Sequence, residues 1–259
     1  MKVNLMGGLG NQMFQYAFGR SLSLARNIPL FFDRSWFAGK PDFQSYTLDA
    51  YDVGINFGGS DGPLYTERGL PFDQNALSAP ADSVFHGYWQ TEKYFNADVV
   101  RKELSRPKGE PSDKMKRIAQ DINTAPNSAF VHVRRGDYLS VENQQVHGCQ
   151  NADYFFGGMR RIEERYETKF FVFSDDTTWC RQTFLGENVQ VVDSNNREKH
   201  WDVWLMSLCS HAIISNSSFG WWGAWLNPKT ERVVIAPKKW FLTKELDDRD
   251  IVPERWIKL

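Results

Sequence analysis

The segment AFVHVRRGDY, residues 129–138, decides the fold class, because an apolar strand runs directly into charged residues. The apolar part covers residues 129–133, and Arg134, Arg135 and Asp137 follow it. Apolar strands followed by polar residues and then a helical pattern recur at 169–185 and 212–226. Strands that alternate with helices in this way predict a parallel sheet covered by helices on both faces.

The N-terminal end carries the same pattern. A short apolar run at 3–6 leads into the turn GGLGNQ, residues 7–12, and a helical apolar spacing follows over 13–26. Residues 28–32 read as the next strand, so the chain begins with a βαβ unit. A segment rich in Pro and Gly near 105–127 favours a boundary there. The sequence therefore predicts two α/β domains, residues 1–125 and residues 126–259.

Composition narrows the function classes. Among 259 residues, 31 Lys and Arg stand against 32 Asp and Glu, a net charge of −1, which argues against nucleic acid as a partner. Three cysteines without a CxxC pair favour reduced thiols and predict neither a zinc site nor a disulfide framework. A start without signal-peptide character, and apolar runs too short to span a bilayer, predict a cytoplasmic protein with at most peripheral membrane contact.

Polar clusters follow the predicted strands at 7–12, 134–137, 174–176 and 215–218. Ligands of open α/β sheets bind beyond the carboxyl ends of the strands, so these clusters can share one site. The first and last precede helices, whose free N–H groups favour anions, although a simple helix cap explains either cluster alone. Arg134 and Arg135 beside Asp137 suit a diphosphate clamp, with an ordinary surface ion pair as the alternative.

Two further observations bear on the ligand. The turn GGLGNQ lacks the GxGxxG spacing and no GxxxxGK[ST] occurs, which disfavours a dinucleotide oxidoreductase and a P-loop enzyme. Aromatic residues make up 15% of the chain, and they favour either a packed core or a platform for sugars. The helical spacing of Trp221, Trp222 and Trp225 favours the core for these three.

Four motifs together resemble a known family. GGLGNQMFQYAFGRSL (7–22), HVRRGDY (132–138), FVFSDD (171–176) and DVWLMSLCSHAIISNSSFGWWGAWLN (202–227) occur in order, as in the bacterial α-1,2-fucosyltransferases. Shorter parts are similar to the inverting α-1,6 and protein O-fucosyltransferases. The resemblance implies a GT-B architecture, in which two Rossmann-like domains face a cleft. It also implies GDP-β-L-fucose as donor, a β-galactoside acceptor, and neither a metal nor a cofactor.

The resemblance also implies roles for individual residues. Arg134 matches the arginine that contacts the donor β-phosphate, and Asp202 matches an aspartate that reads guanine. The residues expected to bind GDP-fucose are Asn11, Arg134, Arg135, Asp175, Asp202, Ser217, Ser218 and Phe219. Gln12 is expected on the acceptor side, and the N-terminal domain is expected to carry the acceptor.

The expected reaction is inverting, metal-independent transfer of L-fucose to the 2-hydroxyl of a terminal β-galactose. Arg134, Asp137 and His132 form the expected catalytic group. Asp137 is the preferred general base, with His132 and Glu142 as alternatives close in the sequence. A transferase of another linkage, such as α-1,6, is one alternative. A non-catalytic protein that binds glycans or nucleotide sugars is the other.

Overall fold

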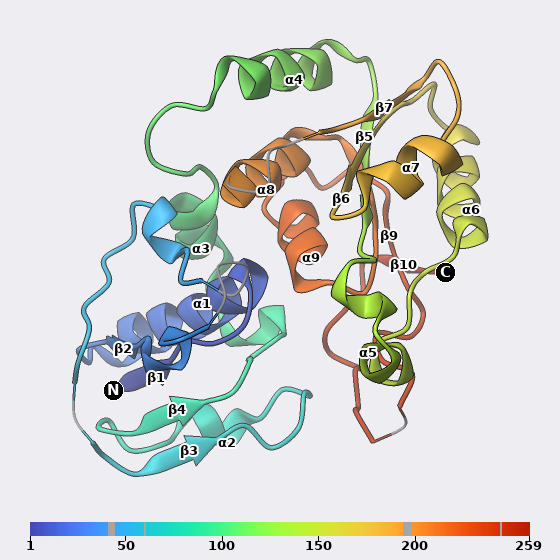
Figure 1. The fold of residues 1–259 in the computed structure, drawn as a ribbon. Helices are drawn as coiled ribbons and strands as arrows, with labels where there is room; N and C mark the ends of the chain where they lie inside the picture. Colours follow the sequence, from blue (N-terminus) through green and yellow to red (C-terminus); the bar gives the residue numbers. More distant parts are fainter. Residues whose placement is uncertain (41–44, 60, 194–197, 244) are drawn as a thin grey trace. The chain divides into compact units, whose positions relative to one another are not determined.

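The chain forms two compact units, which are described separately (Figure 1). The computed structural model describes residues 1–40, 45–59, 61–193, 198–243 and 245–259. Unit 1 comprises Met1–Lys108 and Leu246–Pro253, and unit 2 comprises Gly109–Glu245 and Glu254–Leu259. The domain boundary expected from the sequence lay between residues 125 and 126. Helix α4 (Asp113–Thr124) instead belongs to unit 2, because its apolar face is buried and α4 packs on α8 (Lys199–Leu208).

Unit 1 is built on a parallel sheet in the strand order β2-β1-β4-β3. Its strands are β1 (Lys2–Asn4), β2 (Phe31–Asp33), β3 (Leu64–Thr66) and β4 (Val84–His86). Its helices are α1 (Leu9–Arg26), η1 (Ser35–Phe37), η3 (Leu48–Ala50), α2 (Gln74–Leu77), η4 (Glu92–Tyr94) and α3 (Ala97–Leu104). The predicted strand–turn–helix–strand start is confirmed. Strand β3 was not predicted, because three residues with little burial carry no clear period.

Helix α1 begins inside the glycine turn and not after it. The backbone N–H groups of Asn11 and Gln12 both donate to the carbonyl of Gly8, at 3.0 and 3.1 Å, so the first helical turn starts at Leu9. Gly7 has a φ of 76°, a conformation that side-chain-bearing residues rarely adopt. The glycine turn is therefore short and leads directly into a largely buried helix.

Unit 2 contains a second parallel sheet, in the order β10-β9-β8-β5-β6-β7. Its strands are β5 (Ser128–Val133), β6 (Lys169–Ser174), β7 (Val189–Val191), β8 (His211–Ile214), β9 (Val234–Ala236) and β10 (Ile257–Lys258). Its other helices are η5 (Asp137–Leu139), α5 (Val141–Val146), α6 (Ala152–Glu163), α7 (Thr177–Thr183) and α9 (Ser218–Trp225). The strands predicted at 129–133 and at the starts of 169–185 and 212–226 are present as β5, β6 and β8. The expected α/β fold with parallel sheets is confirmed for both units.

Successive side chains of β5 point alternately toward the two helical layers that cover the sheet. Ala129, Val131 and Val133 belong to an apolar core that includes residues of α6 and α7. Phe130 and His132 therefore face the layer of α8 and α9, on the other side of β5 and β6 (Figure 1). Trp221, Trp222 and Trp225 are buried in that layer, as predicted, and provide packing. None of the helices within the described residues is both long enough and apolar enough to cross a bilayer.

Candidate functional site

The charged cluster at the end of β5 is centred on Arg134. Its Nη2 lies 2.7 Å from Oδ1 of Asp137, and its Nη1 lies 2.8 Å from Oδ2 of Asp175, which follows β6. Its guanidinium carbon lies 5.6 Å from the centre of the Tyr138 ring. Two carboxylates and one ring thus orient a partly exposed guanidinium, which are the contacts that the surface ion-pair interpretation expects.

Arg135 extends in another direction. Its Nε lies 3.1 Å from Oδ2 of Asp176, and its guanidinium carbon lies 4.2 Å above the ring of Trp179 in α7. Asp176 also caps α7 by accepting the Trp179 N–H. The backbone N–H of Arg135 donates to Oδ1 of Asp175. Arg135 therefore links the loop after β5 to α7, whereas Arg134 pairs with the carboxylates of Asp137 and Asp175.

Ser215 links the arginine loop to the segment before α9. Its hydroxyl donates to the carbonyl of His132 at 2.8 Å and accepts the Arg134 N–H at 3.0 Å. The next residue, Asn216, is held through its side-chain amide, which donates to the carbonyls of His147 and Trp240. The hydroxyl of Tyr138 donates to the carbonyl of Asn216. The predicted clusters at 134–137, 174–176 and 215–218 are thus joined by direct hydrogen bonds.

The N-terminus of α9 presents free backbone donors. The Ser217 N–H donates to the carbonyl of Ser215, and the Trp221 N–H donates to Ser217. Between them, the backbone N–H groups of Ser218, Phe219 and Gly220 make no hydrogen bond to any residue the structure describes. Ser217 makes no side-chain cap, so the simple capping role is not realised. Unpaired N–H groups at a helix start form a binding place for an anion.

His132 is buried beneath this helix start. Its side chain is 5% exposed, its ring centre lies 5.6 Å from that of Phe219, and Nδ1 has no hydrogen-bond partner in the described chain. A Cβ on Gly220 would lie 2.6 Å from Nδ1, so only glycine allows the helix to approach the ring this closely. Burial lowers the pKa of His132 to about 4, so the imidazole is neutral at neutral pH. These contacts favour a positioning role over direct catalysis.

Helix α8 begins with two charged residues, Lys199 and Asp202, and only Asp202 was predicted as a site residue. Asp202 lies in the first turn of α8. Lys199, one turn earlier, was missed. Burial and then the charge of Arg134 lower the pKa of Lys199, while Asp175, Asp202 and Asp137 act in the opposite direction. Lys199 therefore shares the electrostatic environment of the Arg134 cluster. Its spacing of one helical turn from Asp202 was the available signal.

The two candidate residues of unit 1 have mainly internal contacts. Oδ1 of Asn11 accepts a hydrogen bond from Nε2 of Gln90 at 2.8 Å. Gln12 is 0% exposed, donates to the carbonyls of Gly7 and Ser45, and accepts the Thr47 N–H. Gln12 thus holds another segment in place, and its amide is fully used by the protein itself.

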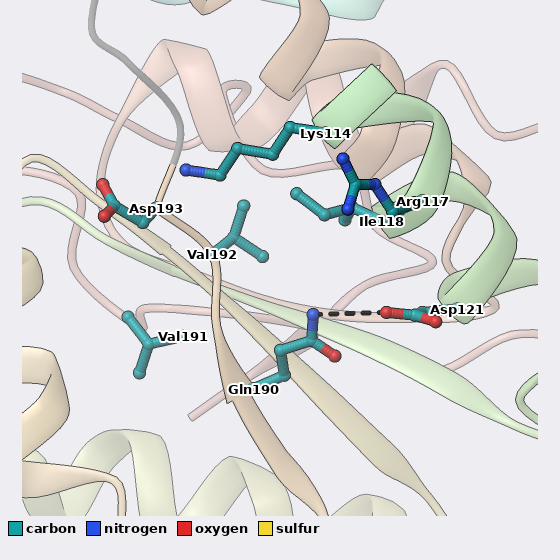
Figure 2. A pocket seen from close by; sticks show the side chains of 8 residues that line it. All are labelled: Lys114, Arg117, Ile118, Asp121, Gln190, Val191, Val192 and Asp193. Carbon is teal, nitrogen blue, oxygen red and sulfur yellow. Dashed lines mark hydrogen bonds between the residues drawn. The ribbon is translucent and has the colours of Figure 1, made fainter. Parts of the chain in front are cut away.

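Two further features were considered as ligand sites. Among the residues with described positions, no cluster of His, Cys, Asp and Glu has the makings of a metal site. A hollow of about 420 Å³ lies between α4 and β7. Figure 2 shows the Lys114 side chain extending across it toward Asp193, and the Gln190 amide bonded to Asp121. None of the residues that line it is a candidate named above.

Comparison with known proteins adds sequence relatives. Residues 67–259 match the family described as Glycosyl transferase family 11. An α-1,2-colitosyltransferase of Escherichia coli is 34% identical, over 99% of this chain and 98% of that protein. The O-antigen biosynthesis glycosyltransferase WbnK of Escherichia coli is 38% identical over 51% of this chain and 45% of its own length. The galactoside 2-alpha-L-fucosyltransferase Sec1 of Mus musculus is 33% identical over 40% of this chain and 30% of its own length.

Solved structures support the fold. The fucosyltransferase NodZ from Bradyrhizobium aligns with a TM-score of 0.60 at 14% identity, covering 88% of this chain and 93% of NodZ. A variant of Arabidopsis thaliana FUT1 in complex with GDP aligns with a TM-score of 0.54 at 11% identity, covering 97% of this chain and 74% of FUT1. At such identities the likeness concerns the fold alone. The fold is GT-B-like, as the sequence resemblance implied.

Proposed function

The chain belongs to glycosyl transferase family 11 and is a glycosyltransferase, and from that premise we propose that it transfers L-fucose from GDP-β-L-fucose to the 2-hydroxyl of a terminal β-galactose. One observation carries the proposal. The oriented guanidinium of Arg134 and the unpaired N–H groups at the start of α9 are joined through Ser215. Together they form a compact set of donors for a leaving diphosphate.

The chemistry of inverting transfer explains why such donors are needed. The acceptor oxygen attacks the anomeric carbon from the face opposite GDP, and the bond from that carbon to the β-phosphate oxygen breaks. Negative charge grows on that oxygen as GDP departs. Preorganised N–H donors aimed at the developing charge stabilise the transition state without a reorganisation cost. Arg134 and the α9 N-terminus supply these donors, and the proposal requires neither a metal nor a cofactor.

Four further residues are assigned roles from their positions near the proposed GDP-fucose site. Asp202 can accept two hydrogen bonds from the guanine edge, and its position in the first turn of α8 suits this role. Asp175 acts through Arg134, because its carboxylate orients the guanidinium. Arg135 acts through Asp176 and α7 and positions the loop. Lys199 adds a cation close to the same carboxylates.

Asp137 remains the proposed general base for the acceptor hydroxyl. Its carboxylate is half exposed and only Oδ1 pairs with Arg134, so Oδ2 stays available for a proton. His132 is not proposed in this role, because it is buried and packed against Gly220. Its proposed task is to support the start of α9.

Colitose is a second sugar to test as donor, because one relative is a colitosyltransferase. The colitosyltransferase matches this chain over nearly its whole length. Colitose differs from fucose by lacking the 3-hydroxyl group, so a GDP-linked colitose would share the diphosphate and the guanine with GDP-fucose. The proposed diphosphate site would therefore not distinguish the two donors, and contacts to the sugar ring would have to do so.

A donor and acceptor panel tests the proposal. Purified protein is supplied with GDP-fucose or GDP-colitose and with a set of β-galactosides, and GDP release is measured with and without EDTA. We expect α-1,2-linked product from GDP-fucose, identified by NMR, with turnover unchanged by EDTA. An α-1,6 linkage, or binding without turnover, would replace the proposal with one of its alternatives. A strong preference for GDP-colitose would change the donor but keep the mechanism.

A further inference from the structure

Unit 1 displays a partly exposed aromatic cluster near the end of β2. It consists of Arg34, Trp36, Phe37, Tyr46 and Phe57, here called the aromatic face. These residues come from three separate segments of the chain. All are at least partly exposed, and the Phe57 side chain is 43% exposed. Exposed aromatic groups gathered in one place commonly mark a binding site.

The rings of the aromatic face form a continuous set of contacts. The ring centre of Tyr46 lies 5.6 Å from that of Phe57 and 6.1 Å from that of Phe37, and both pairs meet edge to face. Trp36 continues the set at 5.2 Å from Phe37. The guanidinium carbon of Arg34 lies 4.3 Å from the centre of Phe57 and 5.7 Å from that of Tyr46. The result is an apolar surface with a cation stacked on it.

Hydrogen bonds hold each segment of the aromatic face to the core of unit 1. The Phe32 N–H donates to the carbonyl of Asn56, and the Gly58 N–H donates to the carbonyl of Phe32, so Phe57 is fixed beside β2. The carboxylate of Asp33 accepts the Ser35 N–H and starts η1. The buried amide of Gln12 fixes the backbone on both sides of Tyr46. The aromatic face is therefore preorganised, which favours binding because little freedom is lost.

Two cations and a phenol border the aromatic face. Within the part of the chain that the structure describes, the Arg34 guanidinium makes no ion pair or hydrogen bond. Lys40 places its Nζ 4.7 Å from the centre of the Trp36 ring. Burial raises the pKa of Tyr46 to about 12, with the charge of Asp49 as a further cause, so the phenol keeps its proton. Flat apolar rings bordered by donors fit a pyranose, which offers a C–H face and hydroxyl oxygens around its rim.

We propose that the aromatic face is a saccharide-binding subsite for the acceptor glycan. A pyranose ring of the acceptor would pack its C–H face against Phe57, with the Tyr46 ring standing at 75° to that ring and bordering the sugar on one side, and Arg34 would donate to its hydroxyl oxygens. The assignment of this glycan as acceptor rests on the proposed function, whereas saccharide binding itself does not. Gln12, expected on the acceptor side, acts on this subsite as a positioning residue.

Two variants and a matched control test the subsite. Phe57→Ala removes a ring, and Arg34→Gln removes the stacked cation. Leu64→Ala is the control, because it removes another exposed apolar side chain of unit 1, which is 66% exposed and lies on β3. Binding of a β-galactoside disaccharide is followed by saturation-transfer NMR, and kinetics are measured for donor and acceptor. We expect about tenfold weaker saccharide binding and a tenfold higher acceptor KM for both variants, the size of one lost contact. Donor KM and slow hydrolysis of the donor by water should not change.

The outcomes separate this inference from the proposed function. Unchanged saccharide binding in both variants, or an equal loss in Leu64→Ala, overturns the subsite whichever donor the enzyme uses. Saccharide binding that depends on Phe57 and Arg34 supports the subsite even if GDP-fucose is not consumed. Melting curves identify a variant that fails to fold. Arg34→Gln keeps the test decisive, because the Arg34 side chain lies at the surface, and the one backbone hydrogen bond of Arg34, from the Phe37 N–H to its carbonyl, does not depend on the side chain.

Discussion

Arg134 is the residue on which the proposed chemistry depends most. We expect Arg134→Ala to lower kcat by about 10²–10³, because it removes a preorganised donor from the leaving phosphate. The melting temperature should change little, since partly exposed ion pairs contribute only about 0–1 kcal/mol each. Arg181→Ala is the control, because Arg181 also pairs with an aspartate in unit 2 but is more exposed. Near-normal turnover in Arg134→Ala would discard the assignment.

Glu67 supports a different prediction at the residue scale. Its carboxylate accepts the backbone N–H groups of Tyr88 and Trp89, at 2.7 and 3.0 Å, and Trp89 has a positive φ of 57°. Burial raises the pKa of Glu67 to about 7 from its ordinary 4.5, outweighing those two hydrogen bonds. The folded state thus binds a proton more tightly than the unfolded state. The contribution of Glu67 to stability is complete below pH 4.5 and is lost as the pH rises through 7.

The contribution of Glu67 to stability is measured by comparing the free energies of unfolding of wild type and a variant. We expect the free energy of unfolding of Glu67→Gln, relative to wild type, to shift by about 3 kcal/mol in favour of the variant between pH 4.5 and 8. The variant should still be less stable at low pH, since its amide NH₂ faces a backbone donor. Glu187→Gln, at an exposed position, should show no such shift. Urea unfolding at several pH values measures these free energies. Plots of unfolding free energy against pH that run parallel for all three proteins would refute the raised pKa of Glu67.

The limits of sequence reasoning are visible in single residues. The adjacency of Arg134 and Asp137 at a strand end predicts their ion pair, and the structure contains it. Arg135 could not be predicted in the same way, because its direction is set by Trp179 on a different element. Residues 35–125 carried no usable motif, and the ring contact between Phe57 and Tyr46 depends on the hydrogen bonds that fix their segments to β2 and to Gln12. Such contacts between distant segments leave no periodic trace in the sequence.

Helix α9 provides the test at the scale of one element. Gly→Ala inside a helix ordinarily gains about 1 kcal/mol. At Gly220 the new Cβ would lie 2.6 Å from Nδ1 and 2.8 Å from Cγ of His132, and the buried ring has no room to move. We therefore expect Gly220→Ala to lose about 1–3 kcal/mol of stability and to bind GDP more weakly, because the helix start is displaced.

The controls for α9 follow from the same contact. Gly54→Ala meets nothing within 4 Å and should leave stability and GDP affinity unchanged. His132→Ala combined with Gly220→Ala should recover part of the loss, since the smaller side chain makes room for the Cβ. Calorimetric melting and titration with GDP measure both quantities. A higher melting temperature for Gly220→Ala alone would show that His132 does not confine the helix.

Elements were predicted best where a strand and a helix alternate with clear periods. β5, β6 and β8 are central, almost wholly buried strands, so their continuous apolar runs identified them. The start of α1 was predicted too late, because glycines in a helix resemble a turn until their burial is known. β10 has two residues and joins the sheet edge through β9, which local sequence cannot reveal.

At the scale of the whole molecule, each unit has its own sheet and core. The segment Leu246–Pro253 returns from unit 2 to unit 1, where Asp250 accepts hydrogen bonds from Phe72 and Lys93. A division by sequence alone cannot include such a return, since the segment lies far along the chain from its partners. The proposed donor site belongs to unit 2, and the aromatic face belongs to unit 1.

Hydrogen exchange tests this division of labour in the unmodified protein. The N–H groups of Ser218, Phe219 and Gly220 have no partner in the described chain and should exchange rapidly without ligand. We expect GDP to slow their exchange at least tenfold, because phosphate oxygens accept these hydrogens, while the amides of α4 stay unchanged. A β-galactoside should slow exchange at 45–47 and 56–58 instead. Rapid exchange at the α9 start under saturating GDP would remove the helix from the donor site, and with it the single observation that carries the proposed function.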